Sequence, residues 1–269
     1  MQAGSQRSMA AVLEKANAVL ESDVDADKLG DELFAFALTL DSRHSLRRAL
    51  TEPAVPADAK STLLHRVAEG KIAPTTLEVV DVAVRLRWSQ GRDLADALEH
   101  ASVTAHVAKA DSEGHLDDLE DNLFRFARIV DAHSGLREAL ADPAYPLEGK
   151  RKLLDTLLEG KVGSSTEKLL DQAAAARHRS LPAVLDTYQK IAAERRDRLV
   201  ATVWVAADLS TDHRGRLAAA LSRQYDHDVH LNVIVDPEVL GGVRVAVGDE
   251  VIDSTVQTRL RQAHRRLEH

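Results

Sequence analysis

The chain has 269 residues, a formal net charge of −8 and no cysteine. Its length predicts one large domain or a few small ones, and a hydrophobic content of 44% is enough for packed cores. The acidic balance argues against a general nucleic-acid-binding protein, because phosphate groups attract basic surfaces. The lack of cysteine excludes disulfides, cysteine-ligated zinc, iron–sulfur clusters and thiol nucleophiles. No apolar run in the sequence reaches the ~20 residues of a membrane span.

The first two-thirds of the chain contain an internal duplication behind a helical segment at Ala10–Leu20. Leu29–Lys71 aligns without a gap on Leu119–Lys161, at an offset of ninety positions. Both copies contain Leu-Phe-x-Phe-Ala, then Pro-Ala-x-Pro, then Glu-Gly-Lys. A repeat of this kind indicates a structural unit that has been duplicated.

Each copy is predicted to be helical. Leu33, Phe36, Ala37 and Leu40 recur with the spacing of one buried helix face. The Pro-Ala-x-Pro segment interrupts the helices, and Gly70 is a suitable residue to end one. The pattern predicts two antiparallel bundles of about five short helices each. The join between them, at 108–116, is compatible with either a continuous helix or a hinge.

Four basic residues occupy equivalent positions in the two copies. Arg47 aligns with Arg137, and Lys71 aligns with Lys161. Two interpretations remain open for them. They are either contacts to a partner or solvated ends of helices, where cations are common.

The hydrophobic period changes after Arg198, which predicts a third domain. Runs of β-branched residues at 199–205 and 229–235 flank a helical segment that Ser210 or Thr211 caps. An alternating strand at 243–247 and a final helix from Asp253 complete a β-α-β-β-α order. The predicted fold is therefore mainly α, with helical bundles at 1–110 and 111–197 and a small α+β domain at 198–269.

The segment from Leu231 to Val256 is rich in acids and glycines, and it invites two chemical interpretations. Asp236, Asp249 and Asp253 are possible ligands of a divalent cation. Each also suits a strand end, a turn or a helix cap, and we favour that structural role. Gly241 and Gly242 are not followed directly by a helix, so a phosphate loop is not expected. The twelve histidines are scattered, and we expect no catalytic residue, no metal and no cofactor.

The same segment resembles the C-terminal motif of the delta subunit family of F-type ATP synthases, called oligomycin-sensitivity-conferring protein in mitochondria. The motif fills the order Val-Asp-Pro-x-x-Leu-x-Gly-x-x-Val-x-Val-Gly-Asp-x-Val-Ile-Asp from Val235 onward. The helical repeat carries a second family pattern. The residues that form the signature of the C-terminal motif are Asp236, Pro237, Gly241, Gly242, Gly248, Asp249 and Asp253. The second helical copy is similar to the long actinobacterial form, either free-standing or cut from a fusion behind subunit b.

The resemblance implies structural work without catalysis. Members bind the N-terminal helices of alpha subunits with the helical domain and hold subunit b with the C-terminal domain. This implies a stator subunit in the peripheral stalk of a proton-translocating ATP synthase, peripheral on the cytoplasmic face of the plasma membrane. It implies no nucleic-acid partner and no direct membrane span.

The last helix supplies a candidate contact with the stalk. Arg259, Arg261, Arg265 and Arg266 are suited to pair with the acidic end of a coiled coil, and a solvated helix face is the equal alternative. The sequence leaves two other functions open. One is a helical adaptor for unrelated soluble partners, and the other is an enzyme with a site in the Gly- and Asp-rich segment.

Overall fold

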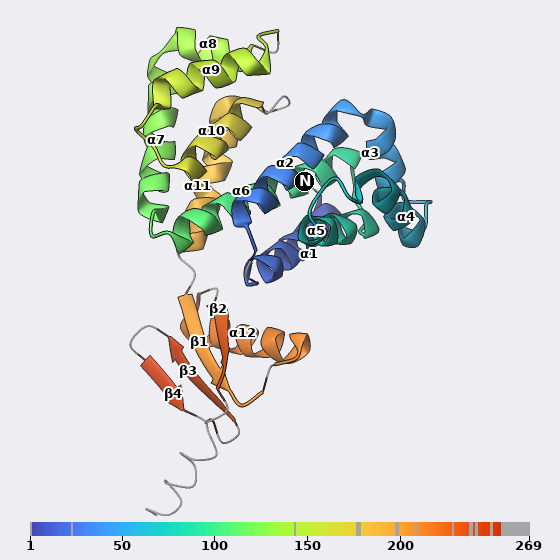
Figure 1. The fold of residues 1–269 in the computed structure, drawn as a ribbon, viewed down its shortest axis with the longest axis vertical. Coiled ribbons are helices and arrows are strands. Elements are labelled where there is room, and N and C mark those ends of the chain that lie inside the picture. The colour runs from blue at the N-terminus through green and yellow to red at the C-terminus, as the bar shows by residue number, and fades with distance from the viewer. Residues whose placement is uncertain are drawn as a thin grey trace, which may run out of the picture. The chain divides into compact units, whose positions relative to one another are not determined.

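The computed structural model describes residues 2–22, 24–142, 144–175, 179–196, 199–207, 209–227, 229–236, 239, 242–247 and 250–253. These residues fall into two compact units, Met1–Arg195 and Arg196–His269. The first is helical and the second is a small α+β unit, as the sequence predicts (Figure 1). Each unit is described separately below.

The helical unit contains eleven of the helices assigned in the described part of the chain. Helices of copy one recur in copy two at the expected offset, so that α2, α3, α4 and α5 correspond to α7, α8, α9 and α10. The helices are α1 (Ala3–Leu20), α2 (Ala26–Ser42), α3 (His44–Thr51), α4 (Ala57–Ala68), α5 (Pro74–Arg85), α6 (Gly91–Ser112), α7 (Leu116–Ala132), α8 (Ser134–Ala141), α9 (Leu147–Leu158), α10 (Ser164–Ala175) and α11 (Leu181–Arg196).

Helix α6 belongs to both copies. Leu94, Leu98 and Ala101 contribute to a hydrophobic core made with α1 to α5. Val103 and Val107 contribute to a second core made with α7 to α11. The offset that relates α2 to α7 also places α1 on residues 93–110, inside α6. We therefore call α1–α6 the first bundle and α6–α11 the second bundle, with α6 as the shared helix.

Three glycines end helices of this unit, and Gly70 is the one that the sequence predicts. Gly70 and Gly160 follow α4 and α9 with φ angles of +74° and +66°, the left-handed conformation that glycine adopts without strain. Gly114 has the same conformation between α6 and α7, with a φ of +75°. The join at 108–116 is thus a helix to Ser112 followed by a glycine turn.

The α+β unit contains β1 (Leu199–Val205), α12 (Thr211–Tyr225), β2 (Val229–Val235), β3 (Val243–Val247) and β4 (Glu250–Asp253). The strand order is β2-β1-β3-β4, with β1 and β2 parallel and the other pairs antiparallel. Ser210 caps α12 by accepting from the His213 N–H at 3.3 Å.

The sequence-based order misses β4 because a four-residue strand is too short to show a period. Its strand conformation comes from pairing with β3. The helix expected from Asp253 onward lies outside the described residues.

Candidate interaction surfaces

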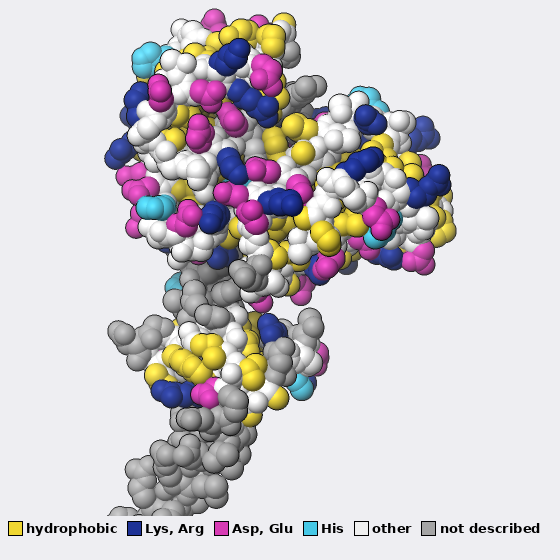
Figure 2. All heavy atoms as spheres, in the orientation of Figure 1, with side chains coloured by type: hydrophobic (Ala, Val, Ile, Leu, Met, Phe, Trp, Pro, Cys, Tyr) yellow, Lys and Arg dark blue, Asp and Glu magenta, His cyan; other side chains and the backbone are white. Residues whose placement is uncertain are grey.

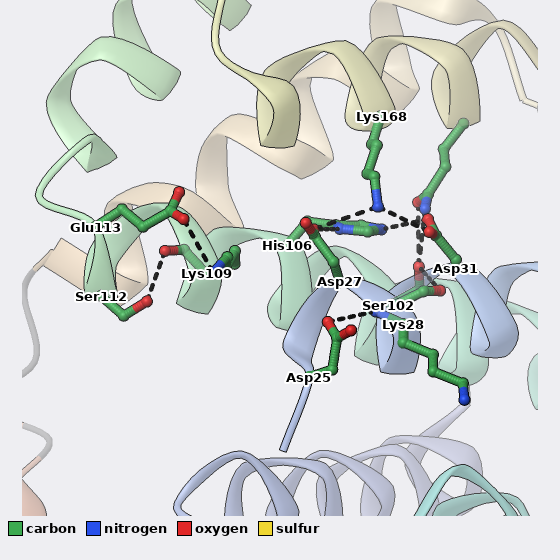
Figure 3. Close-up of polar contacts among 12 residues, drawn as sticks. Asp25, Asp27, Lys28, Asp31, Ser102, His106, Lys109, Ser112, Glu113 and Lys168 are labelled. Atoms are coloured by element: carbon green, nitrogen blue, oxygen red, sulfur yellow. Dashed lines mark hydrogen bonds and ion pairs between the residues drawn. The ribbon is translucent and has the colours of Figure 1, made fainter. Parts of the chain in front are cut away.

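A polar cluster fixes the two bundles to each other inside the helical unit (Figure 3). Its centre is His106 of the shared helix, whose side chain is fully buried. Nδ1 of the imidazole lies 3.1 Å from Oδ1 of Asp27, and Nε2 lies 3.5 Å from Oδ1 of Asp31, both on α2. Lys168 reaches from α10 to Oδ2 of Asp31 at 2.7 Å. Side chains of three helices therefore meet at one point.

Close packing of the backbone accompanies this cluster. A Cβ added at Gly30 would lie 2.6 Å from Nε2 of His106, so α2 can approach α6 this closely only with glycine. Ser102 Oγ donates to the carbonyl oxygen of Gly30 at 2.7 Å and accepts from Nε2 of Gln172 at 3.0 Å. The shared helix is thereby hydrogen-bonded to both bundles.

The charge balance of the cluster favours a neutral imidazole. Burial lowers the pKa of His106, although the hydrogen bond to Asp27 and the charge of Asp31 oppose the shift. The pKa of Lys168 is raised: burial works against its charged form, but the hydrogen bond and charge of Asp31, with a contribution from Asp27, prevail. Lys168 therefore supplies the positive charge that balances the two carboxylates.

A second buried contact joins α6 to the end of the helical unit. Glu99 is only 5% exposed, and its Oε1 accepts from Nη2 of Arg179 at 2.7 Å and from the Tyr188 hydroxyl at 3.0 Å. Burial and the adjacent Glu99 carboxylate raise the pKa of Tyr188. A buried carboxylate paired with a guanidinium and a phenol holds α11 in one register against the shared helix.

The four repeated basic residues act within their own bundles. Nη1 of Arg47 lies 3.1 Å from Oδ1 of Asp41, and Nη1 of Arg137 donates to the carbonyl oxygen of Asp131 at 3.4 Å. The ammonium groups of Lys71 and Lys161 donate to carbonyl oxygens four residues earlier, at 2.7 and 2.8 Å. These are contacts at helix ends, which is the structural interpretation left open by the sequence.

The second bundle exposes large apolar side chains. Phe124 is 56% exposed and Ile129 is 47% exposed, both on α7, while Tyr145 and Leu157 are also exposed. Single exposed apolar residues are common on proteins, and Phe124 and Ile129, five positions apart, lie on different faces of α7.

The sheet of the α+β unit has two different faces. Buried residues of β1, β2 and β3, with Leu221 of α12, form its core. On the opposite face, Trp204 pairs in register with Ile234 on one side and Arg244 on the other. The guanidinium of Arg244 lies 5.2 Å from the Trp204 ring centroid, in cation–π geometry. Figure 2 shows apolar side chains gathered over these strands, and Ile234 and Val251 are exposed.

Of the signature residues that the structure describes, Asp236 and Gly242 lie beside strands, in the connection between β2 and β3, and Asp253 lies in β4. The Asp236 N–H donates to the carbonyl oxygen of Val205 at 2.8 Å, and the Asp236 carbonyl accepts from the Val239 N–H. Gly242 has a φ of +81° before β3. Asp253 ends β4 opposite Arg244. The other predicted positions lie outside the described residues: Pro237, Gly241, Gly248, Asp249, Arg259, Arg261, Arg265 and Arg266.

Two negative observations apply to the described residues. They contain no group of three or more His, Asp or Glu side chains arranged to hold a metal ion. None of their helices is long and apolar enough to cross a bilayer.

Sequence reasoning missed the cluster around His106. Lys168 aligns with Glu78, and Gly30 aligns with Glu120, so both positions break the repeat. A comparison of the copies for such breaks would have pointed to the cluster, because residues that join two copies have no reason to be repeated.

The fold defines a class of protein: a helical scaffold of two similar bundles with a small α+β unit. Comparison with known proteins makes the assignment specific. Residues 100–267 match the family model described as the ATP synthase delta (OSCP) subunit. The chain belongs to this family, which confirms the resemblance found in the sequence.

The relatives named "ATP synthase subunit delta" match over nearly their whole length. The protein from Streptomyces griseus is 45% identical over 99% of both chains. That from Streptomyces avermitilis is 45% identical over 98% of this chain and 97% of its own. A chain in the solved mitochondrial ATP synthase hexamer of Toxoplasma gondii covers 62% of this chain at 18% identity. Its TM-score of 0.29 supports no structural conclusion.

Proposed function

We propose that the chain is a non-catalytic stator subunit in the peripheral stalk of a proton-translocating F-type ATP synthase. In this proposal the helical unit binds N-terminal helices of alpha subunits, and the α+β unit holds the end of subunit b. The complex would place the chain at the cytoplasmic face of the plasma membrane, as a peripheral subunit. Family membership over nearly the whole chain carries the proposal.

The physical demand on a stator supports this role. A subunit that resists torque must grip two partners at once without yielding between the contacts. Two contacts on one chain raise the effective concentration of each partner. The buried cluster at His106 and the Glu99–Arg179 pair make the two bundles one compact unit. We propose that the first and second bundles, which share α6, act as one rigid support over 1–197, and that 198–269 forms a separate module.

Affinity capture tests the proposal directly. The tagged full chain is used to recover partners from detergent-solubilised membranes, with alpha subunits and subunit b as the readout. We expect both in fixed ratio to the chain. Recovery of unrelated soluble proteins instead, together with unimpaired ATP synthesis in a strain lacking the gene, would favour the helical adaptor.

A charge variant separates the two contacts. Serine in place of Arg259, Arg261, Arg265 and Arg266 should weaken recovery of subunit b while alpha subunits are still recovered. Arg216→Ser in α12 is the control, because its side chain is 66% exposed and pairs only with Asp212 of the same helix among the interactions assigned to it. If the variant with four serines recovers as much subunit b as the Arg216→Ser control does, the four arginines do not form the proposed contact.

A further inference from the structure

A cavity of about 570 Å³ lies in the second bundle at the start of α10. Its wall combines the end of α6, the first turns of α7 and the loop before α10. The Glu167 N–H donates to the carbonyl oxygen of Gly163 at 3.1 Å, so the helix begins there. Gly163, Ser164, Ser165 and Thr166 all line the cavity. Their N–H groups have no partners within the helix and attract negative charge.

The first bundle fills the same place with its own carboxylate. Oε2 of Glu32 accepts from the Ala73 N–H at 2.8 Å and from the Thr76 hydroxyl at 2.6 Å, which caps the start of α5. Ninety positions later, Gly163 and Thr166 stand where Ala73 and Thr76 stand. The binding groups are therefore retained in the second bundle.

The carboxylate itself is missing from the second bundle. Asn122 occupies the position of Glu32 and lines the cavity. Its side chain is shorter by one methylene and has no charge. Ser164 replaces Pro74, which adds an N–H that proline lacks. The second bundle thus has one more donor than the first, and a shorter, uncharged amide stands in place of the carboxylate.

A buried hydroxyl in the cavity wall is an independent observation that points to a ligand. Ser165 lines the cavity and is 5% exposed, and its Oγ has no hydrogen-bond partner among the described residues. Leaving a buried polar atom unpaired is unfavourable. An occupant with acceptor oxygens would satisfy Ser165 together with the helix N–H groups.

The charged side chains around the cavity allow an anion to enter. Arg125 and Lys161 line it, and Arg125 stands where the first bundle has Ala35. Of the carboxylates in the lining, Glu113 lies 2.9 Å from Nζ of Lys109, and Asp118 has a side chain that is 79% exposed, so that solvent screens its charge. Arg125 is 71% exposed and its contact with Asp121, at 3.3 Å, is of the weak surface kind, so its guanidinium can turn to a ligand.

We propose that this cavity binds a carboxylate, which takes the place that Glu32 holds in the first bundle. The ligand accepts hydrogen bonds from the N–H groups at the start of α10 and from Ser165, and Arg125 and Lys161 balance its charge. The carboxylate comes either from a small organic acid or from an acidic side chain of a bound peptide. The site does not depend on the stator role, because the purified chain alone is sufficient to test it.

Amide chemical shifts of the ¹⁵N-labelled full chain test the site. Sodium acetate is titrated against sodium chloride at constant ionic strength. We expect saturable shifts at residues 163–166 and none at residues 75–77, where Glu32 already caps the helix. The absence of saturation up to about 100 mM acetate, or equal shifts at both helix starts, would overturn the proposal, since a capped and an uncapped helix start must differ.

Two variants of one residue separate charge from size. Asn122→Glu restores the acceptor of the first bundle, so it should abolish the acetate response and raise Tm by about 3 °C. Asn122→Gln has the same length without the charge and should keep the acetate response. An unchanged response in Asn122→Glu would show that acetate binds elsewhere. The wild-type titration remains decisive if either variant folds poorly.

Three further probes identify the source of the carboxylate. Tighter binding of succinate than of acetate supports a small organic acid as the ligand. Tighter binding of the blocked peptide acetyl-Ala-Glu-Ala-amide supports a protein side chain. A response to inorganic phosphate with none to any of the carboxylates would overturn the assignment of ligand class.

Discussion

The two helical bundles have the same helices but satisfy their polar groups differently. In the first bundle, Asp81 accepts from the Ser61 hydroxyl and from Nε of Arg85, the latter at 2.6 Å. In the second, the equivalent Asp171 has its Oδ1 buried without a hydrogen-bond partner among the described residues. Asp171 lacks these hydrogen bonds because both donors are replaced in the second bundle. Ala175 stands at the position of Arg85, and Arg151 stands at the position of Ser61.

The pKa values follow this difference. Burial would raise the pKa of Asp81, but the hydrogen bonds from Ser61 and Arg85 outweigh it, and the pKa lies below its usual value. Burial raises the pKa of Asp171 to about 6, with Asp155 among the nearby carboxylates that add to the shift and Arg151 opposing it. At equivalent positions, hydrogen bonds therefore stabilise the charged form of Asp81, whereas burial destabilises the charged form of Asp171.

The two bundles also differ in how far equivalent apolar side chains are exposed. Phe34 is 8% exposed on α2, and its equivalent Phe124 is 56% exposed on α7. Helix α2 is tied to α6 and α10 by the cluster at His106, whereas α7 has the equivalent face open. The second bundle thus helps to cover this face of α2, whereas Phe124 on the equivalent face of α7 remains exposed.

Truncating the two phenylalanines gives the largest expected contrast. Phe34→Ala should lower the free energy of unfolding by about 3 kcal/mol, because it removes a buried ring. Phe124→Ala should change it by less than about 1 kcal/mol, because most of that ring is already in solvent. Urea unfolding of the full chain, followed by circular dichroism of the helices, measures both. Equal losses would show that the open face of α7 is covered in solution.

The close approach of α2 and α6 gives the next largest effect. Gly30→Ala should cost about 2 kcal/mol, because the added methyl meets the fully buried ring of His106. Gly135→Ala in α8 is the matched control, with no atom within 4 Å of the new Cβ. It should stabilise the chain by about 0.5 kcal/mol through helix propensity. If Gly30→Ala were also stabilising, the contact between α2 and α6 would be looser than the structure shows.

Sequence reasoning could find the helices of both copies, since a buried face repeats every three to four residues and the copies support each other. It also predicted Gly70 as a helix end, Ser210 or Thr211 as the cap of α12, and the strands with clear alternation. Sharing of α6 was hidden because a helix used on two sides has no single apolar face. Its buried polar residues Glu99, Ser102 and His106 read as surface positions until three-dimensional packing supplies their partners.

The candidate surfaces were predictable to a smaller extent. The C-terminal motif led to the family, because its turn spacing is specific. Exposure of Phe124 could not be foreseen, since the same residue type at Phe34 is buried and only the neighbouring helices differ. The cavity at the start of α10 was also not predicted, although the alignment of the copies shows Asn122 at the position of Glu32.

The two aspartates give the smallest effect, and their pH dependence has opposite signs. Between pH 3.9 and about 6, Asp171 holds a proton in the folded chain that the unfolded chain has lost, so the free energy of unfolding falls as pH rises. Asp81 behaves in reverse: its stabilisation is present above the usual aspartate pKa and is lost as pH falls through the lowered folded value.

Substitution of each aspartate by asparagine should therefore change the free energy of unfolding in opposite directions near neutral pH. Asp171→Asn should raise the free energy of unfolding by about 1 kcal/mol at pH 7.5. The full shift would correspond to about 3 kcal/mol, but solvent reaches part of the side chain and screens it. The gain should shrink toward pH 4. Asp81→Asn should lower the free energy by about 1 kcal/mol at pH 7.5 because its hydrogen bonds to Ser61 and Arg85 are weakened. Urea unfolding at pH 4, 5.5 and 7.5 measures both variants, and a loss in both at pH 7.5 would mean that the pairing of Asp171 with Arg151, whose Nε lies 4.0 Å from Oδ2, outweighs the cost of burial.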